Sequence, residues 1–181
     1  MANSTLNVSK ALIEDLGFGC ELEGRARKGG GTGVIFNENI KILEKKSKSA
    51  KTFEALKVKV QVKNKTVLNF TNLYRPPPSK KNKYSYKDFE VEYEKLLSSD
   101  ECKMNDYHLG DYNIHLEKQD DPDTISFKNL LEHYGHKQLV TSSTHVKGDI
   151  LDLVITNNDN HNYNLKVGDR FTSSDQYPCI N

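Results

Sequence analysis

Several acidic and amide side chains stand at the ends of apolar runs, where a fold can hold them rigidly. Asp111 and Asn113 follow the apolar end of an expected strand around 107–109 and are two positions apart, so both can face one site. A hard cation such as Mg²⁺, or a water to be activated, needs oxygen ligands held in this way. A plain Asx-turn explains the same segment, so the motif alone leaves both readings open.

A second acid, Asp152, lies inside the strongly apolar run 151–156. Because an unpaired buried carboxylate is costly, we expect its side chain to face a hydrogen-bond donor or a site rather than the core. A solvent-facing position on an alternating edge strand is the alternative. Further along, Asp175 and Gln176 come in a turn just before Pro178.

Other candidate patterns carry less information. His133 and His136 have a spacing that can bind zinc, but no Cys/His cluster accompanies them, so surface histidines are the prediction. The glycines of 29–33 precede a strand and lack the Lys-Ser/Thr ending of a P-loop, which makes nucleotide binding a weak reading. His145 can lie near a site, but its type and spacing assign it no role.

The elements that must position these residues interleave strands and helices. We expect helices over 8–16, from Ser85 with a capping-box-like Asp88, and from Asp121 with Pro122 in its first turn. Strands are expected over 34–36, 56–62, 66–73, 107–109, 151–156 and 163–167, the second and third of them forming an antiparallel hairpin. This order predicts an α/β protein of the α+β type with two packed, mainly antiparallel sheets flanked by helices.

Composition suits a loop-rich α/β protein, with 35% hydrophobic and 28% charged residues, and 181 residues fit one domain. A net charge of +1 conceals an asymmetry: residues 25–87 hold 17 Lys/Arg and 3 acids, whereas 88–181 hold 8 and 18. A basic surface for a polyanion beside an acidic cation site explains this pattern. Lys-rich edge strands that resist aggregation explain it equally well.

Targeting and redox signals point to the inside of the cell. The N-terminus has no basic region followed by an apolar run, so we expect an intracellular protein of the nucleus or cytoplasm that is not secreted and does not enter a membrane. The three cysteines lack metal-type spacing, which favours reduced thiols.

Five ordered segments together resemble the endonuclease/exonuclease/phosphatase family, and most closely its branch in non-LTR retrotransposons. They are RKGGGTGVIF at 27–36, LYRPP at 73–77, GDYNIHLE at 110–117, THVKGDILDLVIT at 144–156 and SSDQYP at 173–178. The resemblance implies a four-layer α/β/β/α sandwich and in-line attack of water on a phosphodiester with Mg²⁺ or Mn²⁺ as cofactor.

The resemblance also implies roles at matching positions. Tyr74 matches a tyrosine that binds the scissile phosphate, and Asp111 and Asn113 match the pair that orients and deprotonates the attacking water. Asp152 matches the acid that holds the catalytic histidine, and Asp175 matches a metal-associated acid. DNA is the implied partner.

Three basic residues are candidates for nucleic-acid contact. They are Arg27, Lys28 and Arg75.

The sequence departs from the family pattern in two places. Gln176 stands where the family has its catalytic histidine. The strands carrying the family's first Asn and its principal metal ligand, the Glu of Glu-Thr-Trp, are expected to precede this chain. We therefore expect residues 1–181 to be one domain, truncated at the N-terminus and incomplete in the last strand.

The resulting functional prediction is a Mg²⁺-dependent DNA endonuclease domain with impaired or lost activity, within a larger polyprotein that also carries reverse transcriptase. The alternatives are a noncatalytic nucleic-acid-binding module, or pseudoenzyme, and a decayed retroelement remnant. RNA-cleaving members and small-molecule phosphatases share the same core, so the fold alone leaves the substrate open, and the oligomeric state is open as well.

Overall fold

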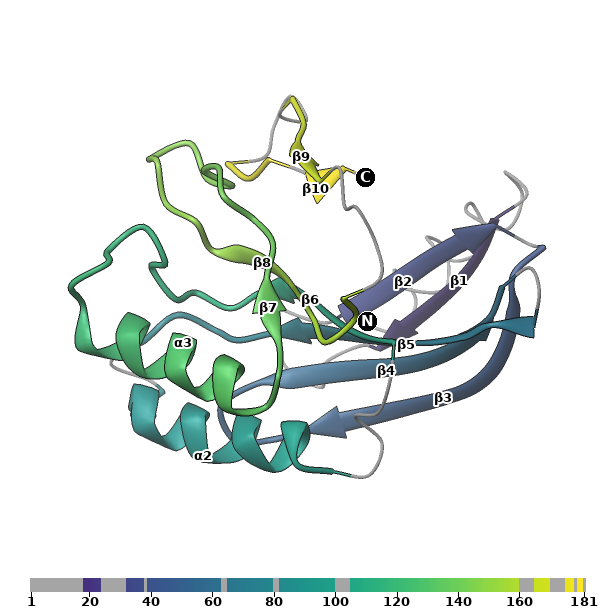
Figure 1. Ribbon diagram of the computed structural model, residues 1–181, viewed down its shortest axis with the longest axis horizontal. Helices are drawn as coiled ribbons and strands as arrows, with labels where there is room; N and C mark the ends of the chain where they lie inside the picture. Colours follow the sequence, from purple (N-terminus) through teal and green to yellow (C-terminus); the bar gives the residue numbers. More distant parts are fainter. Residues whose placement is uncertain are drawn as a thin grey trace, which may run out of the picture.

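A six-stranded sheet with strand order β3-β4-β5-β6-β8-β7 organises the computed structural model (Figure 1). The structure describes residues 18–23, 32–37, 39–62, 65–79, 82–99, 105–159, 165–169, 175–177 and 179–180. The elements are β1 (Phe18–Glu23), β2 (Thr32–Asn37), β3 (Lys41–Ser49), β4 (Glu54–Gln61), β5 (Val67–Tyr74), α2 (Tyr86–Leu97), β6 (Asp106–Asp111), α3 (Pro122–His133), β7 (Lys137–Gln138), β8 (Asp152–Thr156), β9 (Lys166–Val167) and β10 (Cys179–Ile180).

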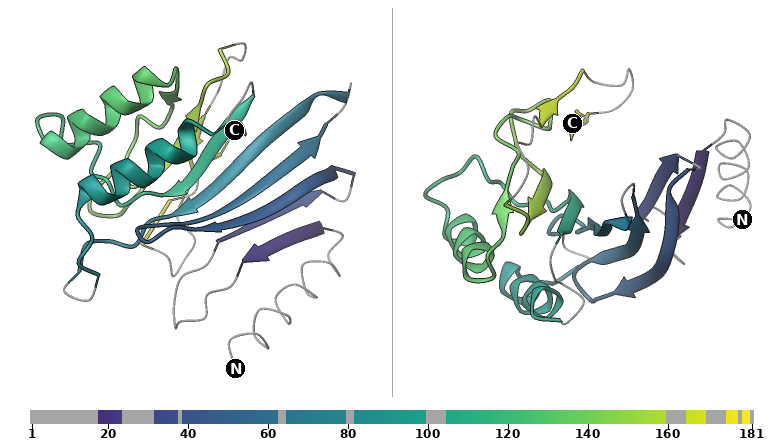
Figure 2. Two further views of the ribbon diagram at one scale, coloured as in Figure 1. Left: turned by 90° about the horizontal axis from the view of Figure 1, so that it is seen from below. Right: turned by 45° about the vertical axis from the view of Figure 1, so that its right-hand side comes forward.

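Both faces of this sheet are covered by other elements. Figure 2 shows α2 and α3 side by side on one face and the antiparallel β1–β2 hairpin on the other. A further two-stranded sheet pairs β9 with β10 near the C-terminus. The described chain thus has three of the four predicted layers, α/β/β, and the helix predicted over 8–16 lies outside the described residues.

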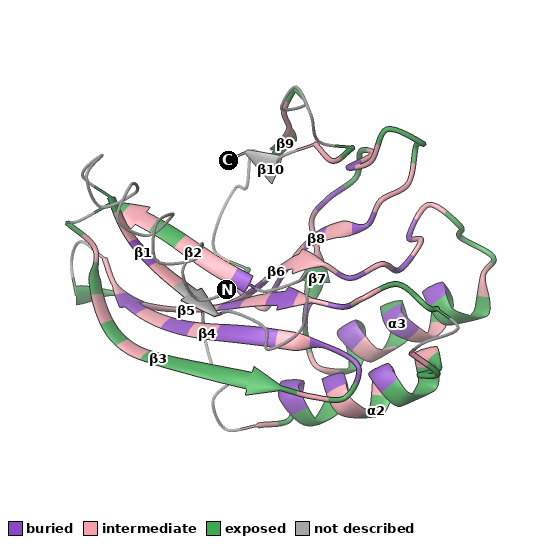
Figure 3. Ribbon diagram, turned by 180° about the vertical axis from the view of Figure 1, so that it is seen from behind, coloured by how far each residue is buried: buried purple, intermediate pink, exposed green. Residues whose placement is uncertain are grey.

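The main hydrophobic core lies between the sheet and the two helices, where buried positions gather (Figure 3). Phe89 and Tyr93 of α2 stack with ring centroids 5.4 Å apart, and Phe127 of α3 lies against both. Leu153 and Ile155 of β8 close this core from the sheet side. Period-2 alternation on the strands and helical spacing on α2 and α3 produced this core, as the sequence predicts.

A smaller core fills the opposite face of the sheet. Leu56, Val58 and Val60 of β4 are buried there against Val34 of β2. Packing between the two sheets leaves an apolar cavity of about 560 Å³, which Val60 and Phe70 help to line.

Capping residues begin both helices as expected. Ser85 accepts from the Asp88 backbone N–H while Asp88 accepts from the Ser85 backbone, a reciprocal capping box. Asp121 accepts from the backbone N–H groups of Asp123 and Thr124 at the start of α3. The predicted β4–β5 hairpin is confirmed as an antiparallel pair.

Three strands were not foreseen from the sequence: β1, β3 and the two-residue β7. Strand β3 lies at the sheet edge with most of its side chains exposed, so its sequence shows little apolar alternation. Strand β1 carries alternating apolar residues, including the buried free thiol Cys20, which is a usable but short signal. The strand predicted over 163–167 is described only as β9. None of the helices in the described ranges is both long and apolar enough to cross a membrane.

A close approach between β5 and β6 depends on a glycine. Gly110 has φ +129°, and a Cβ built at this position would lie 1.9 Å from the Leu73 carbonyl oxygen. Only a residue without a side chain fits both the backbone conformation and the space.

We therefore predict that Gly110→Ala lowers the free energy of unfolding by about 3 kcal/mol or more, because strain and a backbone clash add. Urea denaturation followed by circular dichroism measures this. Gly135→Ala is the matched control. Gly135 has φ +66°, and a Cβ built there would have no atom within 4 Å, so only the backbone conformation lowers the free energy of unfolding, by about 1 kcal/mol. Equal effects of the two substitutions would contradict the steric argument.

Candidate active site

Strand pairing brings three of the predicted site residues to one edge of the sheet. Tyr74, at the end of β5, is the parallel partner of Asp111 at the end of β6. Asp111 is in turn the antiparallel partner of Asp152 at the start of β8. Residues directly opposite each other on neighbouring strands have Cβ atoms roughly 4.5–5.5 Å apart, so the carboxylates of Asp111 and Asp152 lie next to each other.

The turn after β6 positions Asn113 beside them. Its backbone N–H donates to Asp111 Oδ1 at 3.0 Å, and its φ of 49° lies in the left-handed region that asparagine tolerates. The side-chain Nδ2 donates to the Arg75 carbonyl oxygen at 2.7 Å. The Asx-turn reading of this segment is therefore confirmed, and the same turn fixes Asn113 next to the carboxylate pair.

Arg75 stabilises this turn through two hydrogen bonds to its backbone. It is 6% exposed, and its Nη1 donates to the carbonyl oxygens of Tyr112 at 3.1 Å and Asn113 at 2.9 Å. Its guanidinium lies over the Phe89 ring, 5.0 Å from the centroid. This placement leaves the side chain little surface with which to contact nucleic acid, contrary to what its type suggests. The other two basic candidates, Arg27 and Lys28, lie outside the described residues.

Gln176 lies against Asp152. A carboxylate accepts, so the amide is oriented with Nε2 toward it, 2.8 Å from Oδ1 and 2.6 Å from Oδ2. This confirms that Asp152 faces a hydrogen-bond donor. A backbone bridge between His145 and Gln176 brings the 175–177 segment to the site.

Thr144 connects the same segment to the start of β8. This fully buried side chain accepts from the backbone N–H groups of Leu151 and Asp152, both at 3.0 Å. The backbone carbonyl oxygen of Thr144 accepts from the Tyr177 N–H at 2.8 Å. No local pattern assigns Thr144 a role, because only the fold shows that its hydroxyl and its carbonyl oxygen bind two different segments.

Burial raises the pKa of both carboxyl groups. For Asp152 it acts with the nearby Asp111 charge and raises the pKa to about 6, against lowering by the Thr144 hydroxyl and His145. The amide of Gln176 stabilises the ionised form as well. Burial also raises the pKa of Asp111, opposed by hydrogen bonds from Asn113 and Gln176 and by the Arg75 charge.

Asp175, the expected metal-associated acid, lies at the rim with 74% of its side chain exposed. His145 is between two acids: its Nδ1 is 3.3 Å from Asp149 Oδ2, and its Nε2 is 3.5 Å from Asp175 Oδ2. Asp149 also lies 3.4 Å from His115 Nδ1, next to Glu117. His145 therefore does lie near the site, as its motif allowed, and a row of acids and imidazoles borders the carboxylate pair.

The solved structures that resemble this chain share its fold. The endonuclease domain of TRAS1, a telomere-specific non-LTR retrotransposon, superposes with a TM-score of 0.65 at 11% identity over 97% of this chain and 88% of that domain. The chain has the endonuclease/exonuclease/phosphatase fold. TDP2 from D. rerio, solved with a single-strand DNA product, superposes with a TM-score of 0.57 at 11% identity over 94% and 76%. No family model and no curated protein matches the sequence.

The raised pKa of Asp152 predicts a pH-dependent effect of its neutralisation. Because the folded pKa of about 6 exceeds the unfolded value of 3.8, ionisation of Asp152 disfavours the fold above pH 6, and this penalty disappears below pH 4. Asp152→Asn should raise the free energy of unfolding by about 1–2 kcal/mol at pH 8, after allowance for solvent and the Gln176 amide.

Urea titrations at several pH values measure the gain, which should shrink as the pH falls from 6 to 4. The exposed carboxylate of Asp159 pairs with Lys137, and Asp159→Asn serves as the control with little effect. A loss of stability in Asp152→Asn at pH 8 would show that its hydrogen bonds outweigh its burial.

Proposed function

We propose that this domain binds DNA and hydrolyses its phosphodiester bonds with a divalent metal ion, at a rate limited by Gln176. The observation that carries the proposal is the pair of opposed carboxylates, Asp111 and Asp152, with a neutral amide held on the second. Two carboxylates beside a fixed asparagine can orient a water molecule and accept its proton. An Asx-turn with a purely structural role needs only one carboxylate.

Each residue has a place in this chemistry. Asp111 and Asn113, which the Asx-turn fixes to each other, orient the attacking water. Tyr74, level with Asp111 on the neighbouring strand, binds a phosphate oxygen. Asp152 holds Gln176 in the place where a proton carrier would stand.

The donor set fits a hard cation. Mg²⁺ commonly takes one or two carboxylates together with waters and substrate phosphate oxygens, and the exposed Asp175 would hold it here. Mn²⁺ suits the same oxygen ligands. The ion would supply stabilisation of the charge that develops on the phosphoryl oxygens.

Gln176 weakens the reaction because an amide donates a hydrogen bond but does not take up a proton near neutral pH. Loss of a general acid or base lowers a rate by about 10²- to 10⁴-fold. Asp152, with its raised pKa, stays mostly ionised at neutral pH and cannot replace the missing proton donor.

DNA is proposed as the substrate because one structural neighbour is the endonuclease domain of a telomere-specific retrotransposon and the other was solved with a single-strand DNA product. We further propose a retroelement polyprotein with reverse transcriptase as the setting, in the nucleus or cytoplasm.

Plasmid nicking in Mg²⁺ tests the catalytic assignment. Gln176→His should raise the nicking rate at least about 10-fold, because it restores a group that titrates near neutral pH beside Asp152. Chelator or Asp111→Asn should abolish the gain. Gln119→His, the same change at a lysine-paired surface glutamine, is the control and should leave the rate unchanged. If Gln176→His nicks no faster, Gln176 does not occupy the place of a proton carrier.

A noncatalytic DNA-binding module is the second candidate, favoured by the lysine-rich surface of β3. Lys41, Lys45, Lys46 and Lys48 are exposed along this edge strand, although Lys45 pairs with Glu21 and Lys46 with Glu44.

In this case DNA affinity should fall steeply between 50 and 200 mM salt, on the order of 10-fold or more, because each neutralised phosphate releases counterions. Fluorescence anisotropy with a labelled duplex measures it, and the double variant Lys46→Gln/Lys48→Gln should reduce the slope. Salt-independent affinity, or an unchanged slope in this variant, would argue against binding through β3.

A further inference from the structure

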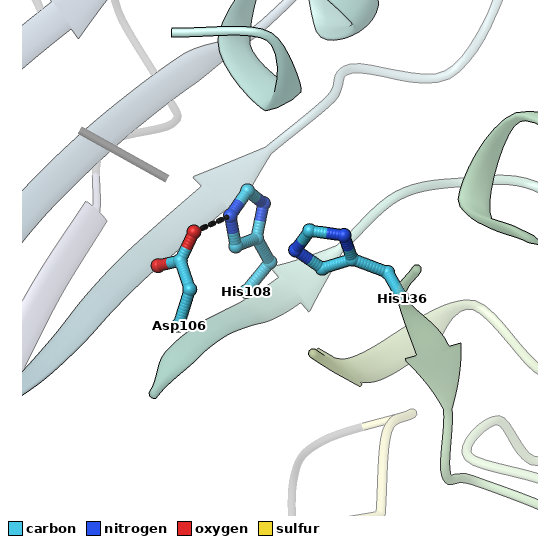
Figure 4. A group of neighbouring side chains, drawn as sticks. All are labelled: Asp106, His108 and His136. Carbon is cyan, nitrogen blue, oxygen red and sulfur yellow. Dashed lines mark hydrogen bonds and ion pairs between the residues drawn. The ribbon is translucent and has the colours of Figure 1, made fainter. Parts of the chain in front are cut away.

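A second polar cluster is buried at the opposite end of β6 from the candidate active site (Figure 4). Asp106 and His108 begin this strand on one face, and His136 reaches them from the connection between α3 and β7. Their exposed fractions are 1%, 0% and 5%. Asp106 and Asp111 are five residue steps apart along the strand, about 17 Å, so the two centres are distinct. His136 was expected at the surface; that prediction is wrong, because its ring turns inward against His108, whereas His133 is exposed as expected.

The hydrogen bonds of His136 fix its tautomer. Its Nδ1 lies 2.9 Å from the Tyr134 carbonyl oxygen, and a carbonyl only accepts, so Nδ1 carries the hydrogen. In the neutral ring Nε2 therefore presents a lone pair. This atom is buried and has no hydrogen-bond partner among the residues that the structure describes. Buried polar atoms normally have a partner, so an unpaired lone pair directed into a polar cluster indicates a missing ligand.

The ring of His108 is held in a similar way. Its Nδ1 lies 2.9 Å from the Tyr93 hydroxyl, and its Nε2 lies 3.0 Å from Asp106 Oδ2. Each imidazole thus has its Nδ1 hydrogen-bonded to an outer group and its Nε2 on the side of the carboxylate (Figure 4). Histidine ligands of metal ions have this arrangement. In the metal-free ring the His108 Nε2–H donates to Asp106 and Nδ1 accepts from the Tyr93 hydroxyl; an ion on Nε2 would displace that proton to solvent and leave Nδ1–H to donate to the Tyr93 oxygen.

We propose that Asp106, His108 and His136 form a binding site for a transition-metal ion of the zinc class. One ligand atom from each residue lies within 4.8 Å of the others. Tetrahedral bonds of about 2.0–2.2 Å place ligand atoms roughly 3.3–3.5 Å apart, so His136 moves inward by about 1 Å on binding. Two imidazole nitrogens and one carboxylate oxygen suit Zn²⁺ or Co²⁺, whereas Mg²⁺ prefers oxygen ligands alone. A water molecule takes the fourth position.

Such an ion would act on the fold rather than on the hydrolytic reaction. It would join the first residues of β6 to the segment between α3 and β7, which strand pairing connects only through β8. Because the ion binds the folded chain, it should stabilise that state by mass action.

Metal titration of the full chain, after removal of metal with a chelator, tests the site. We expect one equivalent of Zn²⁺ by calorimetry, a higher midpoint of thermal unfolding, and the visible absorption of tetrahedral Co²⁺. His136→Gln and Asp106→Asn should each weaken Zn²⁺ binding at least about 100-fold, since each removes a ligand and even an outer partner contributes 10- to 100-fold.

Two controls separate this site from surface histidines. His133→Gln changes the exposed histidine that ends α3, and His115→Gln disables the surface cluster of His115, Glu117 and Asp149. Both should bind Zn²⁺ like the unmodified chain. If the unmodified chain binds no Zn²⁺, the proposal is overturned, and a buried water is the partner of His136 Nε2. Loss of binding in His115→Gln, or unchanged binding in Asp106→Asn, also overturns it. If His136→Gln does not fold, Asp106→Asn and the Co²⁺ spectrum decide the matter. Nicking in Mg²⁺ is independent of these outcomes.

Discussion

The parallel pairing of β5 with β6 is the constraint on which the rest of the structure depends. Among the strand pairs of the described residues it alone is parallel, so the chain must cross from the end of β5 back to the start of β6. Helix α2 makes this crossing and supplies Phe89 and Tyr93 to the main core. The same pairing sets the ends of β5 and β6 level, which is why Tyr74 and Asp111 lie side by side.

The candidate active site is held by backbone geometry more than by attraction between its side chains. Asp111 and Asp152 repel each other, and their closeness is imposed by the β6–β8 register. Hydrogen bonds from Asn113, Thr144 and Gln176 then make the negative charge tolerable. Gln176 donates to the acid as a histidine could, but its amide does not transfer a proton near neutral pH.

The sequence predicted the parts of the fold whose signals are local. Ser85 and Asp121 marked helix starts because capping uses residues next to each other in the chain, and alternation revealed β4 because one of its faces is buried. Strand β3 could not be found in this way, since an exposed edge needs no apolar pattern. At the candidate site, motif order singled out Asp111 and Asp152, which the strand register brings together. The inward orientation of His136 and the hydrogen bonds of Thr144 depend on contacts between distant segments, which no local pattern records.

Arg75 has a consequence for how experiments on basic residues are interpreted. It follows Tyr74 and precedes three prolines, so an alanine scan for DNA contacts would include it. Its guanidinium instead bridges two carbonyl groups of the site turn and rests on an aromatic ring of α2. Truncation would release the turn from the helix and reduce affinity or activity indirectly, through the shape of the site. A loss of function in such a scan would therefore report on the architecture of the turn, and only comparison with a stability measurement would separate this residue from one that touches the nucleic acid.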